Sequence, residues 1–340
     1  MNRSPTFRTQ RRRLLALLAA APAWPARAAG ATLLNVSYDI SREFYKDFNA
    51  TFAVQWKKTH GEDVTLNQSH GGSTRQARSV IEGLAADVIT MNQAIDIDMV
   101  ARRSGLLPAN WAKRLPYGAA PTTSVQIILV RKGNPKNIRD WGDLGRPGVG
   151  AIIPNPKVTG NGRATYLAAW GAALKSGASP ALAQALLARI FANVPVLDGG
   201  GRAATTTFAQ RRIGDALVTY ESEAPLIERE FGAGLEVVYP PRTLLAENPV
   251  SVVDQVVDRR GTRKLAEAYL QYLYSDAGQE IAARHHLRPR NAAVLARHAS
   301  EFPKVDAFSV DEVFGSWAQA QKDHFDDGAL YDQIVAARAR

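Results

Sequence analysis

The stretch Ser-His-Gly-Gly-Ser-Thr-Arg-Gln at residues 69–76 lies between a short alternating apolar run, residues 64–66, and a helical pattern. Four apolar residues recur at i, i+3, i+4 and i+7 after it: Ala77, Val80, Ile81 and Leu84. This spacing predicts an amphipathic helix with Ser73 as its N-cap. A glycine-rich turn that opens a helix points unpaired backbone N–H groups outward, where the helix dipole adds partial positive charge. The stretch therefore predicts a place that favours an anion without a Lys or Arg side chain.

Three other parts of the chain have the same construction. Strand-like residues 150–153 lead to the turn Thr-Gly-Asn-Gly-Arg at 159–163 and then to a helical pattern. Strand-like residues 194–197 lead to the turn Asp-Gly-Gly-Gly-Arg at 198–202 and a short Thr-rich helix. Near the start, residues 33–38 predict a strand, with Asp39 as the cap of the next helix. We expect these four helix starts to converge on one small anion.

Residues 1–28 predict a secretory signal peptide, with a basic start, an apolar middle and an Ala-Arg-Ala cleavage site at 26–28. The arginine run at 11–13 also fits a twin-arginine export signal, so the export route stays open. The apolar part is too short to span a membrane. Removing residues 1–28 takes away six arginines and no acidic residue, which lowers the formal net charge from +10 to +4. The basic balance belongs largely to the leader, and we expect no nucleic-acid partner.

The absence of cysteine from the 340 residues excludes disulfides, thiolate metal sites, cysteine nucleophiles and lipid attachment at a processed N-terminal cysteine. The six histidines form no i, i+4 pair and no recognisable ligand set, so we expect neither a metal nor a cofactor. Neither a nucleophile elbow nor a phosphate-binding loop occurs. We expect a monomer that moves freely in the periplasm.

Strand-like and helical stretches alternate from about residue 33 to 287, which predicts an α/β architecture with a mostly parallel sheet. A long strand at 124–130 predicts a crossing into a second lobe, and residues 251–254 predict the return, so the two crossings make a hinge beside a cleft. The expected divisions are a signal peptide at 1–28, lobe one at 29–121 with 248–300, lobe two at 122–247, and a C-terminal helical tail at 301–340 that packs across the lobes, with a helix at about 310–325.

The expected site offers backbone N–H groups and the hydroxyls of Ser73 and Thr159, with almost no acceptors. Such a pocket suits a fully deprotonated anion and disfavours hydrogen phosphate, whose proton needs an acceptor. Because a carboxylate repels an anion, we expect Asp39 to offer its backbone N–H and to turn its side chain to neighbouring donors. Arg163 and Arg202 follow two of the turns and either steer and partly neutralise the ligand or hold the surfaces of the two lobes by ion pairs.

Six stretches together are more specific than any glycine pattern: Asn-Val-Ser-Tyr-Asp at 35–39, Gln-Ser-His-Gly-Gly-Ser at 68–73, Val-Arg-Lys-Gly-Asn-Pro-Lys at 130–136, Pro-Asn-Pro-Lys at 154–157, Tyr-Leu-Ala-Ala-Trp-Gly at 166–171 and Asp-Glu-Val-Phe-Gly-Ser-Trp at 311–317. Through them the chain resembles the periplasmic sulfate- and thiosulfate-binding proteins of ABC importers over residues 33–334. The resemblance implies a two-lobed type II periplasmic binding protein fold, α/β with a hinge and an interlobe cleft. It also implies closure around a dehydrated dianion held by uncharged donors.

The resemblance also implies roles for single residues. Backbone N–H groups would come from Asp39, Ser73, Gly160, Asn161 and Gly201, and hydroxyls from Ser73 and Thr159. Tyr220 takes the place where sulfate binders of this family have a Trp whose indole N–H touches the anion. The thiosulfate branch is similar to this chain at 160–161, 205–208 and 221–223, whereas Gly71-Gly72 is similar to the sulfate branch, so the choice of anion stays open.

We therefore expect a periplasmic receptor that captures sulfate or thiosulfate and delivers it to a membrane permease driven by a cytoplasmic ATPase, with no catalysis of its own. One alternative is a binding protein for another oxyanion such as molybdate. An alternative from a different class is a secreted hydrolase or transferase that uses an anion, for which no general base stands out. The affinity and the identity of the permease stay open.

Overall fold

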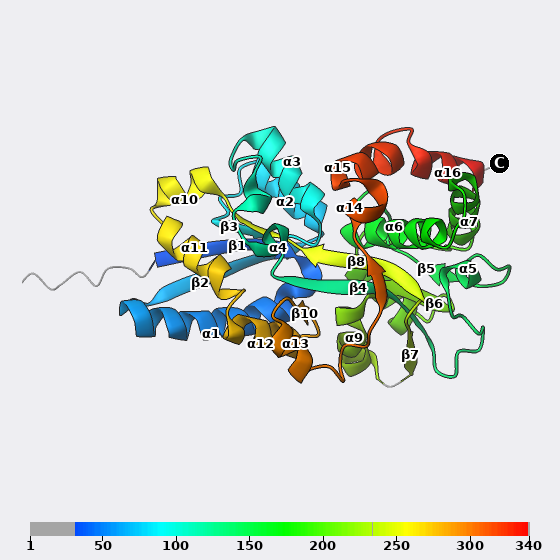
Figure 1. Ribbon diagram of the computed structural model, residues 1–340, viewed down its shortest axis with the longest axis horizontal. Coiled ribbons are helices and arrows are strands. Elements are labelled where there is room, and N and C mark those ends of the chain that lie inside the picture. The colour runs from blue at the N-terminus through cyan, green and yellow to red at the C-terminus, as the bar shows by residue number, and fades with distance from the viewer. Residues whose placement is uncertain (1–30, 233, 339–340) are drawn as a thin grey trace, which may run out of the picture. The chain divides into compact units, whose positions relative to one another are not determined.

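Two β-sheets, each the centre of one lobe, organise residues 31–232 and 234–338, which are the residues described by this computed structural model (Figure 1). The expected signal peptide lies outside the described residues. Within them, no helix is both long enough and apolar enough to cross a membrane.

The first sheet has the strand order β2-β1-β3-β9. Its strands are β1 (Ala31–Tyr38), β2 (Val64–Gly71), β3 (Val88–Thr90) and β9 (Val250–Val252). β1 runs parallel to both β2 and β3, with Tyr38 beside Gly71 and Ser37 beside Thr90, whereas β9 is antiparallel to β3. The carboxyl ends of β1, β2 and β3 therefore meet at one edge of the sheet, where ligands bind in open α/β folds.

Helices cover this sheet and connect its strands. They are α1 (Arg42–His60), α2 (Ser73–Ile81), α3 (Ala94–Ser104), α10 (Asp254–Arg260), α11 (Arg263–Tyr272), α12 (Asp276–Arg284) and α13 (Ala292–Arg297). α1 shows why the sequence is helical there, because Phe44, Phe48, Phe52 and Trp56 recur every four residues and all lie on its buried face. Phe48 and Phe52 meet the ring of Tyr269 from α11 edge to face, at centroid distances of 5.1 and 5.2 Å.

The second sheet has the order β11-β8-β4-β6-β5, and β7 and β10 also pair with β4. Its strands are β4 (Thr122–Arg131), β5 (Ala151–Ile152), β6 (Ala216–Tyr220), β7 (Leu235–Val238), β8 (Arg242–Asn248), β10 (Arg288–Pro289) and β11 (Asp306–Phe308). β4 is buried at every position but its last, which makes it the central strand. The chain passes from the first sheet to the second between β3 and β4, returns between β8 and β9, and reaches the second sheet again with β10 and β11.

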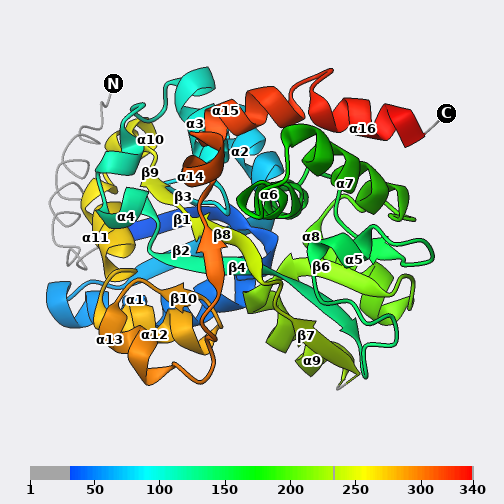
Figure 2. The same ribbon diagram turned by 45° about the vertical axis from the view of Figure 1, so that its right-hand side comes forward.

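Further helices flank the second sheet. They are α5 (Trp141–Leu144), α6 (Gly160–Lys175), α7 (Pro180–Ala192), α8 (Gly201–Thr205), α9 (Ala224–Phe231), α14 (Val310–Phe314), α15 (Trp317–Ala320) and α16 (Leu330–Arg338). The short α4 (Pro116–Ala119) packs instead in the first lobe, where Ala119 shares an apolar core with Ala77 and Ile97. α6 is buried along almost its whole length. Phe325, Tyr331 and Ile334 of the C-terminal region share one apolar core with α6 and α7. Both views show α14 to α16 beside these helices, and α15 near α3 (Figures 1 and 2).

Several sequence predictions differ from the structure by local geometry. Ser73 is the first residue of α2 and Gly72 is its N-cap, so the predicted cap was wrong by one residue. Asp39 begins a short 3₁₀ turn, Asp39–Ser41, and does not cap α1. The predicted strand at 194–197 is wrong because this segment has no regular structure. The helix predicted at 310–325 is broken after Phe314, where Gly315 adopts a φ of 76°.

Candidate functional site

The seven residues expected to bind an anion all line one small cavity of about 20 Å³. They are Asp39, Ser73, Thr159, Gly160, Asn161, Gly201 and Tyr220, and the wall is completed by Ile40, Gly72, Asn92 and Gly200. The first lobe contributes the residues that follow β1, β2 and β3, and the second lobe contributes the starts of α6 and α8 and the end of β6. A cavity of this size has room for a small compact ion, whereas pockets for drug-sized organic ligands are ~300 Å³ or more.

Three helix N-termini meet at this cavity, because α2 begins at Ser73, α6 at Gly160 and α8 at Gly201. Helix geometry leaves the first N–H groups of each without an intrahelical partner. In α6 the side chain of Thr159 accepts from the third N–H, that of Gly162, at 3.0 Å, which leaves the N–H groups of Gly160 and Asn161 for another acceptor. The arrangement therefore presents peptide donors from both lobes to one point.

The two hydroxyls expected to donate to the ligand are already used inside the protein. Ser73 Oγ donates to Asp96 Oδ2 at 2.6 Å, and Thr159 Oγ1 donates to the carbonyl oxygen of Asn155 at 2.8 Å. Because a hydroxyl carries one proton, neither has a second one to give. In this structure these side chains stabilise helix starts, and the ligand bonds expected from them stay a prediction.

Tyr220 lies at the end of β6 with 3% of its surface exposed. Burial raises the pKa of its phenol above the ordinary value, and the negative charges of Asp39, Asp96 and Glu223 add to the effect. Tyr220 therefore keeps its proton at physiological pH, and its O–H is a possible donor at the cavity wall.

The side chain of Asp39 turns back on its own turn, where Oδ1 accepts from the N–H of Ile40 at 3.0 Å. Burial raises the pKa of Asp39, while backbone N–H groups and the neighbouring Arg42 and Arg202 lower it. This agrees with the expectation that the carboxylate finds donors of its own.

Arg163 and Arg202 do not line the small cavity. The Nη1 of Arg163 donates to Thr74 at 3.1 Å and lies 3.8 Å from Asp96, so this buried guanidinium in α6 joins the second lobe to α2 and α3 of the first. Arg202 pairs with Glu230 at 2.7 Å within the second lobe, at an exposed position. Of the two roles left open, Arg163 fits the ion pair between lobes, and Arg202 fits neither a ligand contact nor a link between lobes.

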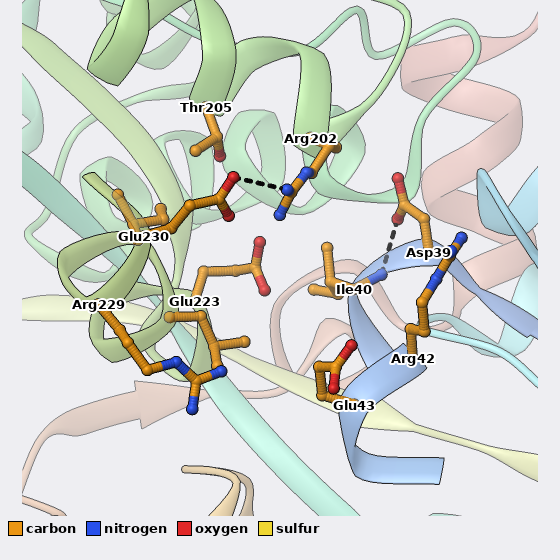
Figure 3. Close-up of a pocket in the computed structure, with 11 residues that line it drawn as sticks. Asp39, Ile40, Arg42, Glu43, Arg202, Thr205, Glu223, Arg229 and Glu230 are labelled. Carbon is orange, nitrogen blue, oxygen red and sulfur yellow. Dashed lines mark hydrogen bonds and ion pairs between the residues drawn. The ribbon is translucent and has the colours of Figure 1, made fainter. Parts of the chain in front are cut away.

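A larger cavity of about 610 Å³ adjoins the small one, and the two share Asp39 and Ile40 (Figure 3). Figure 3 shows Glu223 pointing into it between the elements that carry Asp39 and Arg202. Burial, helped by the charge of Asp39, raises the pKa of Glu223 to about 8. This outer cavity thus combines arginines with carboxylates and carries no concentrated positive charge.

Asn92 is a lining residue that the sequence reasoning did not assign. It follows β3 by two residues and is 92% buried, with 8% of its surface exposed. The order of the strands could have indicated it. β3 is the third parallel strand, so the residues after it are expected at the same edge of the sheet as those after β1 and β2. Among the described residues, no group of three or more His, Cys, Asp or Glu side chains is placed to hold a metal.

Comparisons with known proteins show the family to which the chain belongs. The family of bacterial extracellular solute-binding proteins matches residues 39–288. The chain is 57% identical over 309 residues to the thiosulfate-binding protein of Pseudomonas aeruginosa, covering 91% of this chain and 93% of that protein. It is 51% identical over 304 residues to the sulfate-binding protein of Escherichia coli K12, covering 89% and 92%. The solved structure of the sulfate-binding protein SubI from Mycobacterium tuberculosis H37Rv is similar, with a TM-score of 0.79, 30% identity and coverage of 87% of this chain and 100% of that one. This likeness confirms the expected two-lobed α/β fold.

Proposed function

Because the chain belongs to the bacterial extracellular solute-binding proteins, and among them to the sulfate- and thiosulfate-binding family, we propose that it captures a sulfur oxyanion in the small interlobe cavity for an ABC importer. The anion is held by the peptide N–H groups of Asp39, Ser73, Gly160, Asn161 and Gly201 and by the O–H of Tyr220. The protein carries out no chemical step.

The observation that carries this proposal is the meeting of three helix N-termini at a cavity whose wall contains no Lys or Arg. Donors that are uncharged and already oriented suit a dianion that has lost its water. A hydrogen bond to a charged group contributes about 1.5–3 kcal/mol net. Several such bonds, after the cost of removing water, reach the roughly 8 kcal/mol of a micromolar complex.

The proposed role in transport also rests on membership of the solute-binding family. Residues 1–28 act as a cleaved leader that delivers a monomer to the periplasm, and lobe one (29–121 with 248–300) and lobe two (122–247) close over the anion. The tail, 301–340, packs across the lobes, and the loaded protein docks on a membrane permease driven by an ATPase. The link from Arg163 to Thr74 and Asp96 supports closure, because it joins α6 to the first lobe.

Both sulfate and thiosulfate are proposed ligands. Relatives named for each anion are more than half identical to this chain. Tyr220 supplies a single O–H donor at the cavity wall, and either anion can accept its hydrogen bond.

Isothermal titration of the mature protein with sulfate, thiosulfate, molybdate and phosphate at neutral pH tests the proposal. We expect micromolar or tighter binding of one or both sulfur anions and much weaker binding of phosphate. Tighter binding of molybdate than of either sulfur anion, or equal binding of phosphate, would overturn the choice of ligand.

A further inference from the structure

Asn92 bridges the two walls of the small cavity. It follows β3 in the first lobe, and its carboxamide lies against Gly160 at the start of α6 in the second lobe. The contact is so close that a Cβ built on Gly160 would lie 2.3 Å from Asn92 Oδ1 and 2.9 Å from Nδ2. The backbone N–H of Asn92 points to Ser73 Oγ at 3.4 Å, which ties the residue to the start of α2.

The carboxamide has an unmet hydrogen-bonding need. Its Oδ1 is buried and has no hydrogen-bond partner among the described residues. A buried polar group left unpaired costs about 1–3 kcal/mol, and most buried polar side chains in proteins avoid this cost. Its neighbours Ser73 and Thr74 do avoid it, because both donate to Asp96. Because Oδ1 is an acceptor, a deprotonated anion cannot bond it as placed, but rotation of the carboxamide puts the Nδ2 donor at the same buried position, where a bound oxyanion would complete its hydrogen bonding.

We propose that the carboxamide of Asn92 is a ligand group of this cavity and donates a hydrogen bond from Nδ2 to the bound oxyanion. The inference rests on the proposed function and deepens it. A carboxamide presents two N–H donors on one side and an acceptor on the other, and rotation about its last bond exchanges the two sides. A dianion selects the N–H side, because a hydrogen bond to a charged acceptor is stronger than one between neutral groups.

This role makes Asn92 a determinant of specificity. The other proposed donors are peptide groups, apart from the O–H of Tyr220, so Asn92 and Tyr220 are the proposed donors whose chemistry a substitution other than proline can change. Because Asn92 also touches Gly160 across the cavity, its bond to the anion would form only when the lobes are closed.

The variant Asn92→Asp separates this role from packing, because Asp has the same shape and size as Asn but its carboxylate only accepts hydrogen bonds. We expect its affinity for sulfate and thiosulfate at pH 7.5 to fall more than a hundredfold and to recover in part as the pH is lowered and the carboxyl takes up a proton. For Asn92→Ala we expect a loss of about ten- to a hundredfold. The matched control is Asn49→Ala in α1, which is also 8% exposed, accepts a hydrogen bond from the hydroxyl of Tyr269 at 2.6 Å and lines neither the small nor the larger cavity. We expect this control to lower the melting temperature and to leave affinity within twofold.

Titration of the wild type beside these variants distinguishes the two ways of failing. Wild-type protein that binds neither anion would overturn the proposed function and this inference together. Wild-type binding with an Asn92→Asp variant that binds within threefold would leave the function standing and show that Asn92 only fills space. A crystal structure with the anion in which Nδ2 lies more than 3.5 Å from every ligand atom would overturn the inference as well.

Discussion

Ser73 Oγ donates a hydrogen bond to Asp96 Oδ2 at a distance of 2.6 Å, and this bond fixes the first residue of α2. Asp96 also accepts from Thr74 at 2.9 Å and from Gln93 at 2.8 Å, so a single carboxylate gathers the residues around the helix start. This bond holds Ser73, and with it the start of α2, at the wall of the small cavity.

We therefore predict that Ser73→Ala weakens sulfate and thiosulfate binding by less than about threefold while it lowers the free energy of unfolding by about 1–3 kcal/mol, because the lost bond is to a charged group inside the protein. Titration calorimetry and urea denaturation measure the two effects. A loss of tenfold or more in affinity with unchanged stability would mean that the hydroxyl does touch the anion.

Gly201→Pro removes one peptide donor and little else. Proline fits the first position of a helix, where its missing N–H breaks no intrahelical bond. We predict at least a tenfold loss of affinity with an unchanged far-UV circular dichroism spectrum. The matched control is Gly201→Ala, which keeps the N–H and whose Cβ meets only ordinary contacts, the nearest at 3.6 Å from Asn161. If both variants bind like the wild type, the start of α8 is not part of the site.

Tyr220→Phe tests the O–H at the end of β6. The ring stays in place and only the donor is lost, so we predict a loss of about tenfold in affinity for the anion that contacts it and a smaller loss for the other. Calorimetry with both anions measures the ratio. An equal affinity of variant and wild type for both anions would remove Tyr220 from the donor set.

Gly160→Ala and Gly162→Ala place the same methyl group against different neighbours. The Cβ at Gly160 would meet the carboxamide of Asn92 on the other lobe, whereas the Cβ at Gly162 would meet the carbonyl oxygen of Pro154 at 2.3 Å within the second lobe. We predict that Gly160→Ala lowers affinity with little change in the stability of the unliganded protein, and that Gly162→Ala lowers the melting temperature. Calorimetry and thermal unfolding read the two outcomes, and a reversed pattern would contradict the assignment of Gly160 to the interlobe contact.

Glu223→Gln is predicted to change how stability depends on pH. The pKa of Glu223 is raised from 4.5 to about 8, so the folded protein holds this proton over a range in which the unfolded chain has lost it. The contribution of this group to the free energy of unfolding therefore falls as the pH rises from about 4.5 to about 8, at ~1.4 kcal/mol per pH unit. Glutamine does not titrate, so the variant does not lose this stability. Melting temperatures at pH 5 and pH 9 measure it, and we expect the variant to gain over the wild type only at the higher pH. An advantage that does not grow with pH would show that Glu223 is ionised in the folded state.

The sequence predicted some strands, such as those at 33–38 and 124–130, and placed the starts of α1 and α2 to within two residues, because both follow from local rules. The burial of Ala77 and Val80 follows from the 3.6-residue period, and the cap at Thr159 follows from its hydroxyl and the glycines behind it. The seven cavity residues share one property that sequence reveals, since each lies where a strand ends or a helix begins.

The remaining features depend on partners distant in the chain. Ser73 was expected to donate a hydrogen bond to the ligand. Only the folded structure shows that Asp96, 23 residues away in the chain, accepts a hydrogen bond from its hydroxyl. Asn92 belongs to no recognisable sequence motif. Its unpaired side-chain oxygen and its contact with Gly160, which only the fold shows, mark it as a candidate ligand residue. The apolar run at 194–197 has the composition of a strand, but it forms no regular structure, and β5 pairs instead with β6.

The use of main-chain donors at the three helix starts also affects how this protein can vary. Every amino acid except proline carries the same amide, so a replacement at such a position keeps the attraction for a dianion wherever the added side chain finds room, as at Gly201 but not at Gly160. Selectivity between anions would then evolve through the few side chains at the cavity wall, such as Asn92 and Tyr220, while the peptide N–H groups stay the same. A related protein could change its preferred anion without a change of fold.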